Sequence, residues 1–174
     1  AATARSPWGQ TSPGRRQHTL ARLAALVDAH ADELAALESA ENGVPIGIVR
    51  RFSVAAMGKN LAYYASWIDK MGGRVIPLSS GGALDYVVPE PYFVVAILTA
   101  YNTPSLFLGS KVGPALAAGN AVVVKPSPLA SLPALRFAEL CQEAGLPEGV
   151  FNVVTGPGSK VGMALVRHPG VDKV

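Results

Sequence analysis

The chain has 174 residues and a formal net charge of +3, and its 18 Gly and 14 Pro are dispersed between apolar runs. A chain of this length can bury one sizeable core, so we expect a single domain or part of a larger one, with many short elements and little disorder. The basic residues are scattered rather than gathered on one face, which argues against a nucleic-acid partner.

The only cysteine, Cys141, excludes an internal disulfide and favours a reducing, cytoplasmic setting. The longest apolar stretch lies around Tyr92 to Ala100. It is shorter than the roughly 20 residues that a membrane-spanning helix needs. We therefore expect no membrane partner, and the prediction includes no metal site.

The N-terminal part of the chain predicts two amphipathic helices. The first runs from about Pro13 to Asn42, where Gly43 provides a stop. The second follows Pro45 and ends near Gly72. Their apolar residues, spaced to share one helix face, are Leu20, Leu23, Val27, Leu34 and Leu37 in the first helix and Val54, Met57, Leu61, Tyr64 and Ile68 in the second. Both stripes indicate core packing.

Two short strands are predicted next, Arg74–Leu78 and Ala83–Pro89. Between them, Ser79-Ser80-Gly81-Gly82 suits a four-residue hairpin loop. We expect residues 74–90 to form a hairpin extension of the main domain.

From Tyr92 onward, apolar runs alternate with helical segments. The predicted strands are Phe93–Leu98, Ala121–Val124 and Phe151–Val154, and a fourth begins at Val171. The helices that follow the first three strands are Ser105–Ala118, Ser131–Glu143 and Ser159–Arg167. Apolar strands without polar alternation, each followed by a helix, are typical of a parallel sheet covered on both faces. The predicted fold class is therefore α/β, with a parallel Rossmann-like sheet and flanking helices.

In an open parallel sheet, ligands bind beyond the carboxyl ends of the strands, and this selects three loops. Thr99–Pro104 contains Asn102, whose amide can donate to a developing oxyanion. In Lys125–Pro128, the ammonium of Lys125 at the mouth of the sheet suits ribose hydroxyls or a phosphate. In Thr155–Gly158, the glycines allow close backbone approach at a helix N-terminus that favours anions. Together the loops predict a site for a phosphate-bearing ligand such as a dinucleotide, although each alone also fits an ordinary turn or a solvated strand end.

Four longer segments have a distinctive sequence. They are Gly113–Asn120, Val122–Ser127, Glu143–Gly156 and His168–Lys173. These segments resemble the NAD(P)-dependent aldehyde dehydrogenase superfamily, and the likeness extends from about Trp8 over nearly the whole chain.

The resemblance implies that an aldehyde substrate is oxidised to a carboxylic acid with NAD or NADP, through a cysteine thiolate and a glutamate that activates water. It places Asn102 as the oxyanion-stabilising residue and Lys111 near the same catalytic site. It places Lys125 against the adenosine ribose. The other cofactor-binding residues, implied by the family or lying in the same loops, are Leu98, Thr99, Tyr101, Ser127, Pro128, Gly158 and Gly162.

The sequence departs from the family pattern at two of these places. Ala100-Tyr101-Asn102-Thr103-Pro104 stands where the family has Pro-Trp-Asn-Phe-Pro, which keeps the asparagine but reshapes the substrate entrance. Pro128 stands where the family often has an acid that binds the ribose 2′-hydroxyl. Because no carboxylate repels a 2′-phosphate there, we expect NADP to be accepted.

The resemblance also implies that the catalytic cysteine and glutamate lie beyond Val174, in a catalytic domain absent from this chain. Cys141 is not a substitute, because it lies in a predicted helix with Leu135 and Ala138 at three-residue spacing, as a small buried side chain does. Residues 1–174 then form a partial cofactor-binding domain. Its partners are the missing catalytic half and, through an oligomerisation-type hairpin at 74–90, the other subunits of a homodimer or homotetramer.

Two alternatives fit the same residues. One is a short, non-catalytic nucleotide-binding protein. The other is a CoA-acylating or phosphate-ester-reducing member of the same superfamily, in which the second half of the chain decides the acyl acceptor.

Overall fold

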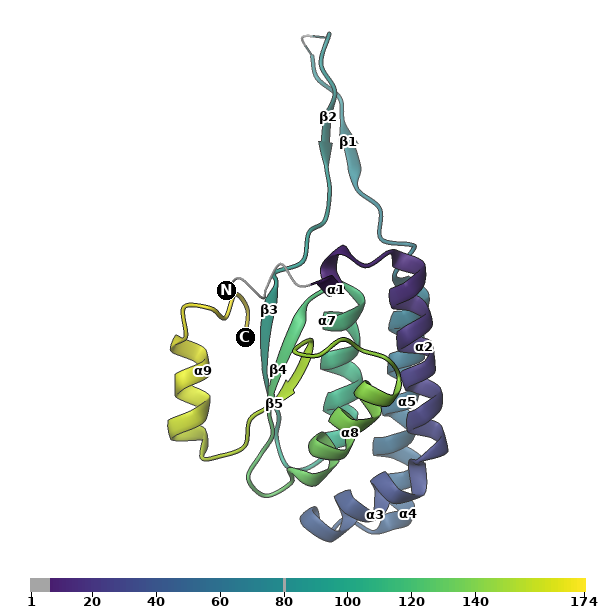
Figure 1. Cartoon of the computed structure of the whole chain (residues 1–174), viewed down its shortest axis with the longest axis vertical. Coiled ribbons are helices and arrows are strands. Elements are labelled where there is room, and N and C mark those ends of the chain that lie inside the picture. Colours follow the sequence, from purple (N-terminus) through teal and green to yellow (C-terminus); the bar gives the residue numbers. More distant parts are fainter. Residues whose placement is uncertain (1–6, 80) are drawn as a thin grey trace.

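A three-stranded parallel sheet forms the centre of the molecule (Figure 1). The computed structural model describes residues 7–79 and 81–174. The strands are β3 (Val94–Leu98), β4 (Ala121–Lys125) and β5 (Phe151–Val153), hydrogen-bonded in that order. One face is covered by α2 (Pro13–Ala29), α5 (Ala55–Trp67), α7 (Gly113–Ala117) and α8 (Leu132–Glu143), and α9 (Met163–Arg167) lies on the other face. The predicted α/β fold with a parallel sheet is confirmed.

The chain returns to the sheet after α9. Lys173 forms a parallel bridge with Val95 of β3, and the Ala96 N–H donates to the Lys173 carbonyl at 2.8 Å. The Val94 N–H donates to the Asp172 carboxylate at 3.0 Å. The fourth strand predicted from Val171 is therefore present as a single bridge, on the side of β3 away from β4.

The first predicted helix is in fact two helices, α2 and α3 (Ala31–Asn42), so the expectation of one helix from Pro13 to Asn42 is wrong. His30 interrupts the run with φ −102° and ψ 19°. No Gly or Pro stands there. The break follows from tertiary packing, because it lets α3 turn and pack against α8 and the π-helical segment η2 (Val49–Val54). Gly43 ends α3 in the left-handed conformation, as predicted, at φ 74°.

The remaining helices match their predicted ranges closely. After α1 (Pro7–Gln10), the second predicted helix consists of α4 (Ile46–Ile48), η2 and α5 in succession. The helix after β3 consists of α6 (Pro104–Phe107), η3 (Leu108–Val112) and α7, and the one after β5 consists of η4 (Gly158–Gly162) and α9. No helix in the described part of the chain is both long and apolar enough to cross a bilayer.

The predicted hairpin is confirmed, with strands shorter than expected. Strands β1 (Arg74–Ile76) and β2 (Asp85–Val87) pair antiparallel and project well beyond the helical body (Figure 1). Apolar side chains on it are exposed: Val75 is 69% and Leu84 is 73% accessible. Ser80 of the predicted loop lies outside the described residues.

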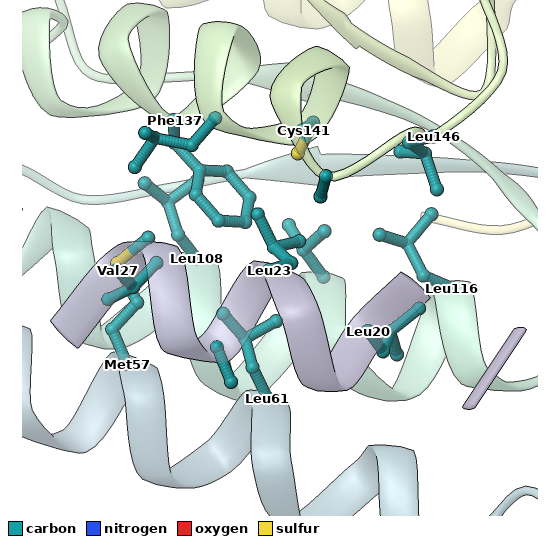
Figure 2. Packing of buried hydrophobic residues seen from close by; sticks show 14 of the residues in the cluster. Leu20, Leu23, Val27, Met57, Leu61, Leu108, Leu116, Phe137, Cys141 and Leu146 are labelled. Atoms are coloured by element: carbon teal, nitrogen blue, oxygen red, sulfur yellow. The ribbon is translucent and has the colours of Figure 1, made fainter. Parts of the chain in front are cut away.

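The hydrophobic core lies where α2 meets α5, α7 and α8 (Figure 2). Figure 2 shows Leu20, Leu23 and Val27 of α2 between Met57 and Leu61 of α5 and the helices above them. All five side chains are fully buried, so the predicted core stripes of the first two helices are confirmed at these positions. This packing holds the helices against the sheet and leaves the loops at its carboxyl edge to carry the site.

Cys141 belongs to this core. The predicted stripe beside it is wrong for Leu135, which is 41% exposed. Steps of three residues drift off one face of a helix with 3.6 residues per turn. The residues that α8 buries are instead Pro133, Ala134, Phe137, Leu140 and Cys141. Burial raises the pKa of the Cys141 thiol well above its usual value, which makes it a packing residue rather than a nucleophile.

Candidate functional site

The carboxyl ends of the three strands meet at one edge of the sheet, as predicted. The Thr99 N–H donates to the Lys125 carbonyl at 3.2 Å, which ties the end of β3 to the end of β4. The Val154 N–H donates to the Val124 carbonyl at 2.9 Å and ties β5 to β4. These backbone bonds bring the three predicted loops together.

Asn102 lies in the bend between β3 and α6. Its side chain is exposed, and that of Tyr101 beside it is 53% exposed. After Thr103, Pro104 occupies the first turn of α6 and is buried. Proline suits this position because its fixed φ is helical and it needs no N–H partner. The loop therefore presents the Asn102 amide to solvent from a firmly packed helix start.

Lys111 lies on η3 and is exposed. Its side chain lines an apolar cavity of about 460 Å³ that runs along β3. Leu98 and Thr99 line the same cavity, together with Phe107 and the C-terminal Val174. The structure thus brings Lys111, Leu98 and Thr99 to one cavity, at the end of the strand that leads to Asn102.

The Lys125 side chain is buried, although the sequence predicted that its ammonium lies at the open mouth of the sheet. Its side chain is only 4% exposed, and Nζ donates to the carbonyl of Pro126 at 2.8 Å. Instead of lying at the open mouth of the sheet, the ammonium is buried against its own loop. A cation held with one carbonyl partner keeps two further N–H donors for a hydroxyl or phosphate ligand.

The two residues after Pro126 have different surroundings. The hydroxyl of Ser127 accepts the Leu129 N–H at 3.2 Å, which closes a local turn. Pro128 is exposed at the tip of that turn. The loop from 125 to 128 therefore carries a buried cation and no carboxylate, which suits an anionic ligand.

The glycines at 156, 158 and 162, which follow β5, differ in what the structure requires of them. Gly156 has φ 138°, a conformation that side chains rarely adopt. At Gly162, a Cβ would lie 3.2 Å from Leu98 Cδ2, so glycine lets η4 pack closely on the end of β3. At Gly158, a Cβ would meet nothing within 4 Å, and φ is not positive. Nothing within the described chain requires glycine at 158, whereas a ligand lying against the first turn of η4 would.

The site therefore fits a nucleotide with phosphate groups. The N-terminus of η4 favours an anion, and Lys125 lies at the neighbouring strand end.

A sequence model of the aldehyde dehydrogenase family matches residues 1–174. The chain belongs to the aldehyde dehydrogenase family. It is 45% identical over 170 residues to NADP/NAD-dependent aldehyde dehydrogenase PuuC of Escherichia coli. It is 46% identical over 167 residues to aminoacetaldehyde dehydrogenase of Pseudomonas aeruginosa. These alignments cover 98% and 96% of this chain, and 34% of each relative.

Solved structures of other proteins share the fold. PnpE of Pseudomonas sp. WBC-3, solved in complex with nicotinamide adenine dinucleotide, has a TM-score of 0.93 and 40% identity over 98% of this chain and 35% of PnpE. An aldehyde dehydrogenase from Bacillus cereus has a TM-score of 0.95 and 38% identity over 99% of this chain and 35% of its own. The chain thus spans about a third of the length of these relatives.

The chain also has polar residues near Asn102 that the sequence patterns did not select. Glu38 is 1% exposed and binds the start of α6, and Asn42 donates to the Tyr101 carbonyl. The available signal was a charged residue in an apolar helical stripe, since Glu38 follows Leu34 at four-residue spacing. A buried carboxylate needs partners, and these partners lie on the Asn102 side of the molecule.

Proposed function

We propose that the protein to which this chain belongs oxidises an aldehyde to a carboxylic acid with NAD⁺ or NADP⁺, and that residues 1–174 supply part of its cofactor site and its oxyanion donor. The observation that carries the proposal is the meeting of three loops at one sheet edge. Exposed Asn102 follows β3, buried Lys125 ends β4, and Gly158, where the described chain leaves room for a side chain, follows β5. Membership of the aldehyde dehydrogenase family supports the reaction class. PnpE, solved with nicotinamide adenine dinucleotide, supports the cofactor class.

The cofactor, when bound, accepts a hydride from the substrate. In this proposal Lys125 donates to the ribose, and the backbone of η4 at Gly158 and Gly162 approaches the adenine and phosphate side. Leu98, Thr99 and Tyr101 contact the cofactor from the end of β3. Ser127 and Pro128 border the ribose.

Asn102 is the proposed catalytic residue. Its uncharged amide donates to the oxygen that becomes negative when a nucleophile attacks the aldehyde carbon. Lys111 lies on η3 near the same end of β3, and its positive charge favours the same oxyanion. The nucleophile is not Cys141, which is buried in the core.

The decisive test uses the full-length product of the reading frame that encodes this chain. Reduction of NAD⁺ and NADP⁺ is followed with a panel of aldehydes, and the acid product is identified by mass spectrometry. We expect Asn102→Ala to lower kcat by about 100- to 1000-fold, because one oxyanion donor is lost. Lys59→Ala, at an exposed position of α5, is the control and keeps wild-type kcat. Wild-type kcat in Asn102→Ala, or acyl-CoA as the product when coenzyme A is supplied, would contradict the proposal.

Pro128 carries the proposed acceptance of NADP⁺. Pro128→Glu places a carboxylate near the ribose 2′ position, and repulsion of a 2′-phosphate by about 1–2 kcal/mol lowers kcat/KM for NADP⁺ about tenfold relative to NAD⁺. Leu129→Glu adds the same charge to the adjacent residue, which is 64% exposed, and leaves the ratio unchanged. If the unmodified enzyme turns over NAD⁺ as well as or better than NADP⁺, this part of the proposal is wrong.

The hairpin supports a proposed homodimer or homotetramer. Its exposed apolar residues, Val75, Leu84 and Tyr86 among them, form a two-stranded surface with nothing covering it within the described chain. An exposed apolar patch of this kind is typical of a subunit interface. Val75→Lys with Leu84→Lys should shift the mass in solution toward the monomer, and an unchanged mass would count against the hairpin as the interface. The proposal also assigns the protein to the cytoplasm, in keeping with its lone, unpaired cysteine.

A further inference from the structure

The last turns of α3 lie against the loop that carries Asn102. Glu38 and Asn42 are four residues apart on α3, so they share one face of the helix. Glu38 binds the chain on one side of Asn102, at Ser105, and Asn42 binds it on the other side, at Tyr101. The short bend between these contacts contains Asn102 itself.

The Glu38 carboxylate holds the start of α6. Its Oε2 atom accepts the Ser105 N–H at 3.1 Å and the Ser53 hydroxyl at 3.0 Å. The Ser53 hydroxyl oxygen in turn accepts the Leu106 N–H at 3.2 Å. Two N–H groups of the first turn of α6 are therefore satisfied by a buried network. A carboxylate at a helix N-terminus is favoured by the helix dipole as well as by its hydrogen bonds.

Asn42 holds the other side of the bend with a single donor. Its Nδ2 donates to the Tyr101 carbonyl at 3.4 Å, across 59 residues of sequence. Its Oδ1 accepts the Val44 N–H at 3.0 Å, which orients the amide. The two functions use different atoms, so substitution can separate them.

Helix α3 is itself anchored to α8. The Glu41 carboxylate accepts the Leu132 N–H at the start of α8, at 2.8 Å. Arg136 of α8 donates to Glu33 of α3, also at 2.8 Å. The contacts that Glu38 and Asn42 make therefore start from a fixed helix.

We propose that Glu38 and Asn42 are positioning residues for Asn102: they clamp the bend on both sides and set the direction of the Asn102 amide. This inference rests on the proposed function, since it assigns to α3 a role in the reaction that Asn102 serves. An oxyanion donor acts only at the correct distance, and a displacement of about 1 Å can cost up to about 100-fold in rate.

The test compares Asn42→Asp with Ala40→Asp in the full-length enzyme. Asn42→Asp keeps the oxygen that binds the Val44 N–H and loses the donor to Tyr101. Ala40→Asp adds the same charge at an exposed position in the last turn of α3. We expect kcat of Asn42→Asp to be about tenfold below that of Ala40→Asp. The Kd for NADP⁺ should change less than about twofold and the thermal midpoints should agree, because the adenosine side of the site and the core are untouched.

A double-mutant cycle with Asn102→Ala separates positioning from general damage. If Asn42 acts through Asn102, then Asn42→Asp lowers the residual kcat of Asn102→Ala by less than about twofold. An undiminished tenfold loss in that background, or equal kcat in Asn42→Asp and Ala40→Asp, overturns the positioning role while leaving the proposed function intact. Wild-type kcat in Asn102→Ala overturns the proposed function itself.

Glu38 provides a second, independent measurement. Glu38→Gln keeps a carbonyl oxygen that can accept both the Ser53 and the Ser105 hydrogen bonds, so most of kcat is retained. Glu38→Ala removes the acceptor, and we expect kcat to fall about tenfold or more. Equal kcat in Glu38→Gln and Glu38→Ala would refute the clamp at this side of the bend.

Discussion

Phe93 has a backbone conformation that its residue type disfavours, and it provides a direct test of how the sheet is built. Its φ is +89°, and it is the one non-glycine residue with positive φ among residues 7–79 and 81–174. Hydrogen bonds to both the N–H and the carbonyl of Phe93 hold this conformation. The Phe93 N–H donates to Asn120 Oδ1 at 3.0 Å, and its carbonyl accepts the Ala121 N–H at 2.7 Å. Asn120 is buried and donates in turn to the Ala115 carbonyl, so the contact cannot relax easily.

The expected magnitude follows from two opposing effects. A side chain at positive φ costs roughly 1–2 kcal/mol relative to glycine, through contact of Cβ with the backbone. Glycine loses more chain entropy than alanine on folding, by about 0.5–1 kcal/mol. The difference predicts that Phe93→Gly is more stable than Phe93→Ala by about 0.5–1 kcal/mol. Comparing these two variants with each other removes the loss of the phenyl ring, which both share.

The neighbouring residue supplies the control. Tyr92 precedes the bend and does not have positive φ. There Tyr92→Ala should be more stable than Tyr92→Gly, by about 0.5–1 kcal/mol. The assay is thermal unfolding of the four full-length variants at one protein concentration, because association also shifts the midpoint. Phe93→Ala melting at or above Phe93→Gly, with the expected order at Tyr92, would show that the backbone strain argument is wrong.

Three further predictions concern packing and charge. Ser105→Ala should raise the free energy of unfolding by about 0.5–1 kcal/mol, because the Ser105 hydroxyl is fully buried without a partner in the described chain. Ser53→Ala should lower the free energy of unfolding by about 1–3 kcal/mol, because the Leu106 N–H loses its acceptor and Glu38 keeps only its bond from Ser105. Denaturant titration compares the two variants, and destabilisation by Ser105→Ala would contradict the first prediction. Cys141 should resist iodoacetamide at mildly alkaline pH and react once the protein is denatured, because burial raises the pKa of its thiol. Peptide mass spectrometry measures the labelling. Rapid labelling of the native protein would show that the thiol is accessible. The hydrogen bond from Arg136 lowers the pKa of Glu33, so the stabilisation is present above the unfolded pKa and is lost as pH falls through the folded pKa. Glu33→Gln should therefore lower the free energy of unfolding at pH 7 by less than about 1 kcal/mol, since the carboxylate is half-exposed. The two proteins should have the same free energy of unfolding once the pH is below the lowered pKa of Glu33, and a difference that persists there would be evidence against the ion pair as its cause.

The local patterns were sufficient to predict the layers of the molecule. Apolar runs of β-branched residues determined β3, β4 and β5, and helical spacing in the N-terminal part of the chain determined the buried faces of α2 and α5. Because parallel strands have their carboxyl ends at one edge, the order of elements also predicted that Asn102, Lys125 and Gly158 lie in neighbouring loops. The backbone bonds between Thr99 and Lys125 and between Val154 and Val124 agree with that prediction.

Other features depend on contacts between distant parts of the chain. The break at His30 carries no Gly or Pro signal and follows from the packing of α3 against η2 and α8. Positive φ at Phe93 follows from hydrogen bonds to Asn120 and Ala121, which a local propensity cannot anticipate.

The sequence by itself thus determined the α/β class and the strand ends at which the site lies, because the periodicity of apolar residues reflects burial directly. The tertiary structure alone decided how the site is held. Glu38 meets Ser105 across 67 residues and Asn42 meets Tyr101 across 59, and a side chain acquires such partners only when the helices have packed. Burial of Lys125 against the Pro126 carbonyl was also decided by tertiary packing, because only the assembled layers exclude water from that ammonium.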